Sequence, residues 1–89
     1  MNTEKEITKI LKALANPRRL RILTFLKREK EAIVSVIAQN IKLSVRSTSK
    51  HLSILYSAKV ILKEQKSLEV YCWINLSQPK YVKEILDLL

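Results

Sequence analysis

The stretch SVRSTSKHLSIL (44–55) combines hydroxyl side chains and cations with apolar residues at helical spacing. Thr48, Leu52 and Leu55 stand at i, i+4 and i+7, which places them on one face of a helix. Ser and Thr are mediocre helix formers, so their density has a cause other than helix stability. Hydroxyls and long cations on the opposite face can reach base edges or phosphates if the helix lies in the major groove of DNA. The pattern therefore indicates a helix that reads DNA, and a solvated face whose serines have no role is the alternative.

Eight side chains of this stretch are candidates for contact with DNA. Arg46 is the best candidate for a bidentate contact to guanine, because its planar guanidinium presents parallel donors, and Lys50 is a candidate for phosphate. Ser44 is also the expected N-cap of the helix. His51 is interpreted as a structural hydrogen-bonding residue or a phosphate contact rather than a catalytic base. The eight are Ser44, Val45, Arg46, Ser47, Ser49, Lys50, His51 and Ser53.

Two further groups of cations can contact phosphates from outside that helix. Lys63 and Lys66 flank the expected tip of a β-hairpin, from which they can reach an adjacent minor groove or its phosphates. Arg18 lies with Arg19 and Arg21 on the polar face of an earlier helix. These arginines can equally cap a helix, form ion pairs or cover the core with their aliphatic stems. Both interpretations of the arginines stay open on the sequence.

The charge is unevenly placed along the chain, which has 89 residues and a net charge of +9. Residues 1–41 carry nine basic and four acidic groups, residues 42–66 carry six and one, and residues 67–89 carry two and three. The excess is therefore +5, +5 and −1 over these three segments. Such a balance favours an anionic partner such as nucleic acid or a membrane surface, and it excludes the C-terminal end from the basic surface.

Neither a membrane span nor a signal peptide is expected. No apolar run approaches the ~18 residues that cross a bilayer, and the N-terminal MNTEKEITKI is too polar for a secretory signal. The single cysteine, Cys72, permits no internal disulfide and fits a reducing cytoplasm. It is interpreted as a small buried hydrophobe. We therefore expect a cytoplasmic protein with no membrane partner.

Apolar periodicity and cap residues predict a mainly α single domain with one β-hairpin. Asn16 and Pro17 mark a helix start, since Asn is a preferred N-cap and Pro is tolerated at the first helical position. This second helix is expected to bury Leu20, Leu23 and Leu26. The expected elements are helices over about 3–15 and 17–27, a short helix up to 41 entered through a brief extended segment, a helix from 45, strands over 60–65 and 69–75, and a last helix over about 79–89. Four helices, a hairpin and a final helix follow the order of a winged helix-turn-helix.

With these elements in place, LKALANPRRLRIL (11–23) and LSVRSTSKHLSIL (43–55) resemble the two most recognisable stretches of the ArsR/SmtB-type winged-helix repressors. The resemblance continues through EVYCWIN (69–75), which stands at the family's second wing strand. Family members are typically homodimeric transcriptional regulators whose terminal helices form the dimer interface. The resemblance implies one winged-helix domain over 1–89 and a homodimer, although the same apolar stripes can be ordinary core. The implied interface residues are Ile7, Ile10, Leu11, Leu14, Val82, Ile85, Leu86 and Leu89.

The chain departs from the family at two turns and at the metal sites. Members often have Gly where this chain has Lys42 and Lys59, and a positive φ at either Lys would cost about 1 kcal/mol. Many members sense a metal through a cysteine pair near the third helix or through Asp and His clusters on the last helix. Soft metals need three or four thiolate or imidazole ligands, which the single Cys and single His cannot supply within a subunit. We expect no metal site and no cofactor.

The leading hypothesis is a transcriptional regulator that binds double-stranded DNA sequence-specifically, as a dimeric repressor without the usual metal sites. Two recognition helices related by a two-fold axis would require an inverted repeat with half-sites ~34 Å apart. The alternative is a winged-helix module that binds protein or RNA, through the basic surface or through an exposed Tyr71 and Trp73. An enzyme is the least supported class, because there is no glycine-rich phosphate loop and no Cys/His pair at a plausible spacing.

Overall fold

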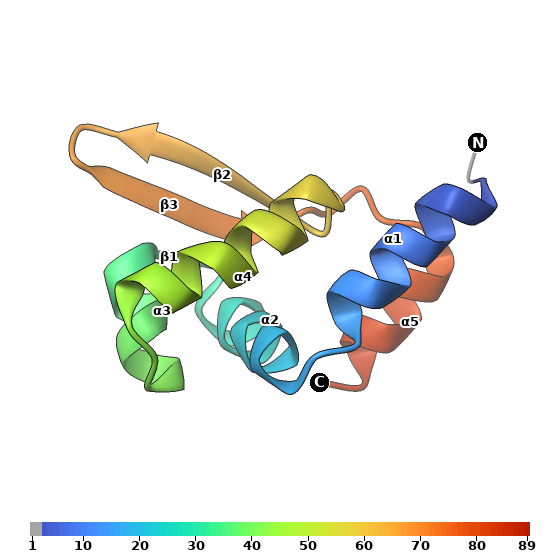
Figure 1. The fold of residues 1–89 in the computed structure, drawn as a ribbon, viewed down its shortest axis with the longest axis horizontal. Coiled ribbons are helices and arrows are strands. Elements are labelled where there is room, and N and C mark those ends of the chain that lie inside the picture. Colours follow the sequence, from blue (N-terminus) through green and yellow to red (C-terminus); the bar gives the residue numbers. More distant parts are fainter. Residues whose placement is uncertain (1–2) are drawn as a thin grey trace.

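Helices and a small sheet alternate along residues 3–89, the part of the chain that the computed structural model describes. The helices are α1 Glu4–Leu14, α2 Pro17–Glu29, α3 Val34–Ile41, α4 Val45–Ser57 and α5 Lys80–Asp87. The strands are β1 Glu31–Ile33, β2 Ile61–Lys66 and β3 Glu69–Ile74. This order confirms the predicted winged helix-turn-helix, and β1 is the extended segment expected before the third helix. The helix-turn-helix pair is α3 and α4, while β2 and β3 form the wing, which projects beyond the helices (Figure 1).

Side-chain caps fix the starts of the two helices on which the sequence argument depends. Oδ1 of Asn16 accepts from the amides of Arg18 (3.0 Å) and Arg19 (3.1 Å), which satisfies two donors that a helix start leaves free. Oγ of Ser44 accepts from the amide of Ser47 at 3.0 Å and begins α4 in the same way. Both predicted N-caps are confirmed.

The sheet has β3 at its centre, with antiparallel neighbours in the order β1-β3-β2. Ala32 and Lys63 stand opposite Cys72 on the two sides, so these three side chains share one face. Cys72 is fully buried beneath that face, as predicted. Tyr71 and Trp73 lie on the other face, but they are only half-exposed. The exposed Tyr71 and Trp73 on which the alternative of a partner contact depends are thus only partly exposed, and each stands opposite a residue of β1 in the sheet.

The core lies between the helices and the inner face of the sheet, and α2 contributes the most to it. Leu23 and Leu26 are buried as predicted, but Leu20 is only half-buried, while Ile22 and Phe25 are buried in addition. The reason is geometric: residues three apart drift by about 60° per step around a helix, so the two steps from Leu20 to Leu26 separate these side chains by about 120° and Leu20 leaves the buried face. Within residues 3–89 no helix is long and apolar enough to cross a bilayer.

The turns between elements use left-handed backbone without glycine. Lys42 ends α3 with φ 60° and ψ 44°, and Lys59 follows α4 with φ 62°. Both residues thus have the positive φ whose cost was anticipated. Lys30, between α2 and β1, and Ser67, at the tip of the wing, have positive φ as well. Each non-glycine residue in this region costs of order 1 kcal/mol.

Candidate nucleic-acid interface

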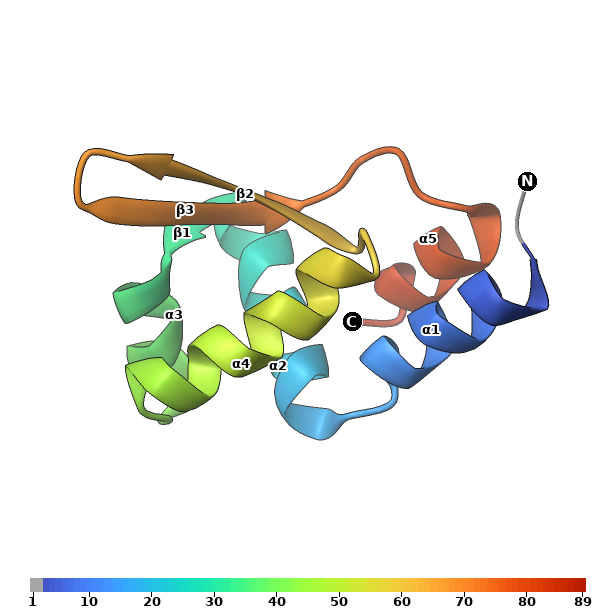
Figure 2. The same cartoon turned by 45° about the horizontal axis from the view of Figure 1, so that its top comes forward.

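The reading helix α4 has one buried and one open face. Thr48, Leu52 and Leu55 are at most 2% exposed and hold the helix against the core. The opposite face is open to solvent along its length, and in Figure 2 α4 runs across the near side of the molecule. The predicted contact residues on this open face, all exposed, are Ser44, Val45, Arg46, Ser47, Ser49, Lys50 and Ser53. The structure thus places seven of the eight candidates of the stretch on one accessible surface.

Four of these side chains meet in one shallow hollow. Arg46, Ser49, Lys50 and Ser53 line it together with Ile54. Within residues 3–89 neither cation forms a salt bridge, so both remain available to an anionic partner. A guanidinium, an ammonium and two hydroxyls that converge on an apolar floor can hydrogen-bond base edges and phosphates at once.

The start of α4 adds backbone donors to the same surface. The Ser44 hydroxyl is committed as an acceptor to the Ser47 amide, so only its own O–H can be donated outward. The first amides of a helix have no carbonyl partner within it, and the helix dipole favours an anion at that end. A phosphate beside Val45 would therefore find both hydroxyl and amide donors.

His51 differs from the other seven, because it is half-buried and hydrogen-bonded to the second helix. Its Nδ1 lies 3.2 Å from Nη1 of Arg19, whose Nε and Nη2 donate to the main-chain oxygens of Ala13 (2.6 Å) and Lys12 (3.1 Å). Burial, and then the positive charges of Arg19 and Arg18, lower the pKa of His51 below its usual value of 6.5. The ring is therefore neutral at pH 7, and Nδ1 is the acceptor because a guanidinium has no lone pair to offer.

Arg19 thus takes the helix-capping role that the sequence left open for the arginines, at the last carbonyls of α1, while its bond to His51 was not anticipated. The Asn16-Pro17 cap starts α2 directly after α1 ends, so a long cation in the first turn of α2 lies beside the free carbonyls of α1. Arg18, by contrast, is exposed as a candidate for phosphate contact has to be. Its positive charge contributes to the lowered pKa of His51.

The wing cations are partly engaged with their own neighbours. Nζ of Lys63 lies 4.7 Å from the ring centroid of Tyr56 at the end of α4. Nζ of Lys66 is 3.6 Å from a carboxylate oxygen of Glu64, and both side chains are 59% exposed. Such exposed pairs contribute little, so a phosphate can replace the carboxylate at small cost. The tip residue Leu68 is 91% exposed.

The terminal helices α1 and α5 run alongside each other at one end of the molecule in both views (Figures 1 and 2). Four of the eight residues implied as dimer interface belong to the chain's own core, namely Ile10, Leu14, Val82 and Leu86. Ile7, Ile85 and Leu89 are half-buried, and Leu11 is 44% exposed. Leu88, which the sequence argument did not include, is 83% exposed. The apolar surface left open at this end therefore consists of the outer part of the predicted stripes, namely Ile7, Leu11, Ile85 and Leu89. We call this surface the rim of α1 and α5.

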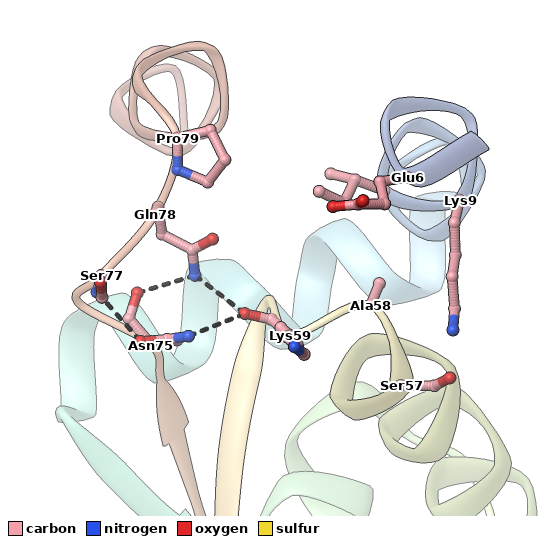
Figure 3. Close-up of a pocket in the computed structure, with 10 residues that line it drawn as sticks. Glu6, Lys9, Ser57, Ala58, Lys59, Asn75, Ser77, Gln78 and Pro79 are labelled. Carbon is pink, nitrogen blue, oxygen red and sulfur yellow. Dashed lines mark hydrogen bonds between the residues drawn. The ribbon is translucent and has the colours of Figure 1, made fainter. Parts of the chain in front are cut away.

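A hollow of about 620 Å³ with a mixed polar and apolar lining lies between α1, the end of α4 and the segment before α5. Nε2 of Gln78 donates to the main-chain oxygens of Val60 (2.8 Å) and Asn75 (2.7 Å). Figure 3 shows this amide also directed to the carbonyl of Lys59, with Glu6 of α1 across the hollow. These bonds fix where α5 begins relative to the end of α4. No group of three or more His, Cys, Asp and Glu side chains within residues 3–89 is placed to hold a metal ion.

Comparison with known proteins gives a consistent assignment. Residues 14–64, more than half of the chain, match the family model of a helix-turn-helix domain. The transcriptional repressor PagR of Bacillus anthracis is 38% identical over 80 residues, which cover 90% of this chain and 77% of PagR.

Solved structures agree with this match. The crystal structure of PagR has a TM-score of 0.76 and 31% identity over 94% of this chain and 92% of PagR. The homodimeric winged helix-turn-helix DNA-binding domain of a possible ArsR-family transcriptional regulator from Mycobacterium bovis has a TM-score of 0.79 and 27% identity. That alignment covers 94% of this chain and 74% of the domain. Reduced HlyU from Vibrio cholerae has a TM-score of 0.79 and 28% identity, over 96% and 85% of the two chains.

Proposed function

The chain belongs to the helix-turn-helix family and is a DNA-binding transcriptional regulator of the ArsR type, and on this premise we propose that it is a homodimeric repressor that reads an inverted repeat through α4. The observation that carries the proposal is the open face of α4. Arg46 and Lys50 stand there beside Ser49 and Ser53, without ion pairs in the described chain, on a helix held by its buried face.

The proposed roles follow from side-chain chemistry. Arg46 contacts guanine through two parallel N–H groups, and the serines donate to base edges or phosphates. Lys50, Arg18 and the wing cations Lys63 and Lys66 neutralise phosphates, which supplies affinity without sequence information. The net charge of +9 supports the neutralisation of phosphates.

The dimer is proposed to form through the rim of α1 and α5. Ile7, Leu11, Ile85 and Leu89 present the part of the apolar stripes that the core leaves open, and Leu88 extends it. Burying such a rim against a second copy removes apolar surface from water, which a chain of this size needs. A two-fold axis there would place two copies of α4 about one DNA turn apart.

Repression is proposed from the similarity to PagR, which is itself named a transcriptional repressor. A dimer that occupies an inverted repeat within a promoter excludes other proteins from the same grooves. We place the protein in the cytoplasm, because the free thiol of Cys72 fits a reducing compartment.

Selection of binding sites from a random duplex library, at two salt concentrations, tests the proposal. Enrichment of an inverted repeat with half-site centres about 10 base pairs apart is the expected result. In vitro transcription from a promoter that overlaps the selected repeat should then fall as protein is added, and a promoter with the repeat far upstream serves as the control. Salt-sensitive binding without an enriched sequence would contradict the proposal, as would the absence of binding.

A further inference from the structure

The orientation of α4 depends on very few directional contacts. Its buried face consists of Leu52, Leu55 and the aliphatic part of Thr48, and apolar packing of this kind is not directional. Within residues 3–89, the hydrogen bond between Arg19 and His51 is the single side-chain hydrogen bond that joins α4 to another element. A rotation of α4 about its own axis would break this bond before it exposed much of the buried face.

The guanidinium of Arg19 joins three helices at one point. It extends from the first turn of α2, donates through Nε and Nη2 to the last carbonyls of α1, and donates through Nη1 to His51 in the middle of α4. Its own main-chain amide is held by the Asn16 cap, so the base of the side chain is fixed as well. A planar fork with fixed donor directions is needed for such a triple contact, and an ammonium group cannot reproduce it.

The contact also sets the protonation of the imidazole. The charged groups that act on the pKa of His51 are Arg19 and Arg18 of α2, and both are cations. No carboxylate is among these neighbours to stabilise an imidazolium. Nδ1 accepts from Arg19, so the proton resides on Nε2, for which the described chain supplies no partner.

We propose that Arg19 is a positioning residue for DNA recognition: through Nδ1 of His51 it fixes the rotation of α4 relative to α1 and thereby determines which bases Arg46 meets. The inference rests on the proposed function, since it takes α4 as the reading helix and α1 as part of the dimer seam. The contact exists only with a neutral ring, because an imidazolium donates from both nitrogens and is repelled by the guanidinium. Acid pH therefore releases α4 from Arg19 and also adds a positive charge, so specific binding falls relative to non-specific binding.

Substitutions at both ends of the bond separate this role from a structural one. Arg19→Ala removes the donor, and His51→Gln moves the side-chain amide away from the Nδ1 position. His51→Asn keeps an acceptor near Nδ1 but cannot titrate. Arg21→Ala, on the exposed face of the same helix, removes one positive charge without touching α4 and is the matched control. The thermal unfolding of every variant is measured first, and Arg19→Lys replaces Arg19→Ala if the alanine variant does not fold.

Affinity for the selected operator and for a scrambled duplex is measured for each variant between about pH 5.5 and 8. We expect Arg19→Ala and His51→Gln to lower the ratio of specific to non-specific affinity about 10-fold at pH 8. Arg21→Ala should weaken both duplexes alike. The ratio should fall in acid for the natural sequence and stay constant for His51→Asn. Operators with half-sites moved one base pair closer or farther should be tolerated better by Arg19→Ala than by the natural sequence.

A measurement without DNA makes failure of this inference distinguishable from failure of the proposed function. Nitrogen chemical shifts of the His51 ring should show the proton on Nε2, and Arg19→Ala should raise the pKa of His51. The positioning role is overturned if the natural sequence selects an operator but Arg19→Ala keeps its specificity ratio and spacing preference. It is overturned equally by a ring whose tautomer and pKa ignore Arg19. If the natural sequence selects no operator, the proposed function fails first, whatever the ring shows.

Discussion

Lys63 of the wing stacks on Tyr56 of α4, with the ammonium nitrogen 4.7 Å from the ring centroid. The pair connects the third residue of β2 to the last turn of the reading helix, where Tyr56 is 44% exposed. A cation over an aromatic face is attracted by the ring quadrupole even at an exposed site. The base of the wing and the end of α4 are thus coupled through side chains as well as through the main chain.

Removing the ring of Tyr56 should weaken this connection. We expect Tyr56→Leu to lower the free energy of unfolding by about 0.5–1 kcal/mol, because the leucine keeps apolar bulk but has no π face. Tyr56→Phe keeps the face and should change stability much less. Urea unfolding of the two variants provides the comparison, and equal losses would show that the hydroxyl, which both variants lack, matters instead of the contact with the cation.

Arg46 and Lys66 should contribute to DNA binding in different ways. Arg46→Ala should cost about 1–3 kcal/mol on the selected operator and relax specificity at one base position, whereas Lys66→Ala should weaken all sequences alike and reduce the salt slope by about 1. Lys83→Ala, an exposed lysine on α5, is the control for loss of one charge. Titrations of operator and scrambled duplex at several salt concentrations distinguish these outcomes. An operator affinity unchanged by Arg46→Ala would remove Arg46 from the reading surface.

The left-handed turn after α4 should be improved by glycine. Lys59 has φ 62°, and its contribution to the hydrogen bonds from Asn75 and Gln78 is a main-chain carbonyl that glycine retains. We expect Lys59→Gly to raise the free energy of unfolding by about 0.5–1 kcal/mol. Lys9→Gly, in the exposed interior of α1, should lower it by about 1 kcal/mol. Thermal or urea unfolding measures both, and a loss of stability in both variants would mean that the Lys59 side chain contributes more than the backbone strain costs.

Stability should depend on the protonation of His51. Its pKa is about 6.5 in an unfolded chain and lower in the folded protein, because of burial and the charges of Arg19 and Arg18. Between the two pKa values the unfolded chain binds more protons, so the free energy of unfolding is highest above pH 6.5 and decreases as the pH falls toward the folded pKa. His51→Asn should remove this part of the pH dependence. Urea unfolding at closely spaced pH values tests the sign, and a contribution of opposite sign would contradict the neutral ring.

The proposed dimer seam can be disrupted with one matched pair of substitutions. Leu11 on α1 and Val36 on α3 are 44% and 42% exposed, but α3 lies at the end of the molecule opposite to α1 and α5 (Figure 1). Leu11→Glu should place charges in the seam and shift sedimentation equilibrium toward the monomer, while Val36→Glu should not. Loss of binding to the inverted repeat should accompany the monomer. If both variants sediment as the natural sequence does, Leu11 is not in the seam.

The sequence predicted the elements well because their signals are local. Asn16 and Ser44 mark helix starts because each caps the helix through a hydrogen bond to an amide two or three residues later. The i, i+4, i+7 pattern of Thr48, Leu52 and Leu55 defines the buried face of α4 within one helix. The open face of that helix followed from the same pattern. Exposure on α4 was therefore predictable residue by residue, with the exception of His51.

What the sequence could not supply depends on contacts between distant elements. The bond between Arg19 and His51 spans 32 positions, and the pairing of β1 with β3 sets Trp73 opposite Glu31, about 40 positions earlier. Ile10 and Val82 likewise belong to stripes that suit a core and an interface equally well until the packing of α1 and α5 is known. Side-chain periodicity identifies a buried face but does not say what buries it.

The four turn residues with left-handed backbone have a consequence for the denatured chain. Lys30, Lys42, Lys59 and Ser67 each stand between two successive elements of the described chain, at positions where glycine would be free of strain. Because the sequence has no glycine at all, its unfolded ensemble has fewer backbone conformations to lose on folding. The backbone strain at these four turn residues in the folded protein is thus offset, in part, by the lower conformational entropy of the unfolded state. Stability in this small domain is determined as much by that ensemble as by the contacts of the folded structure.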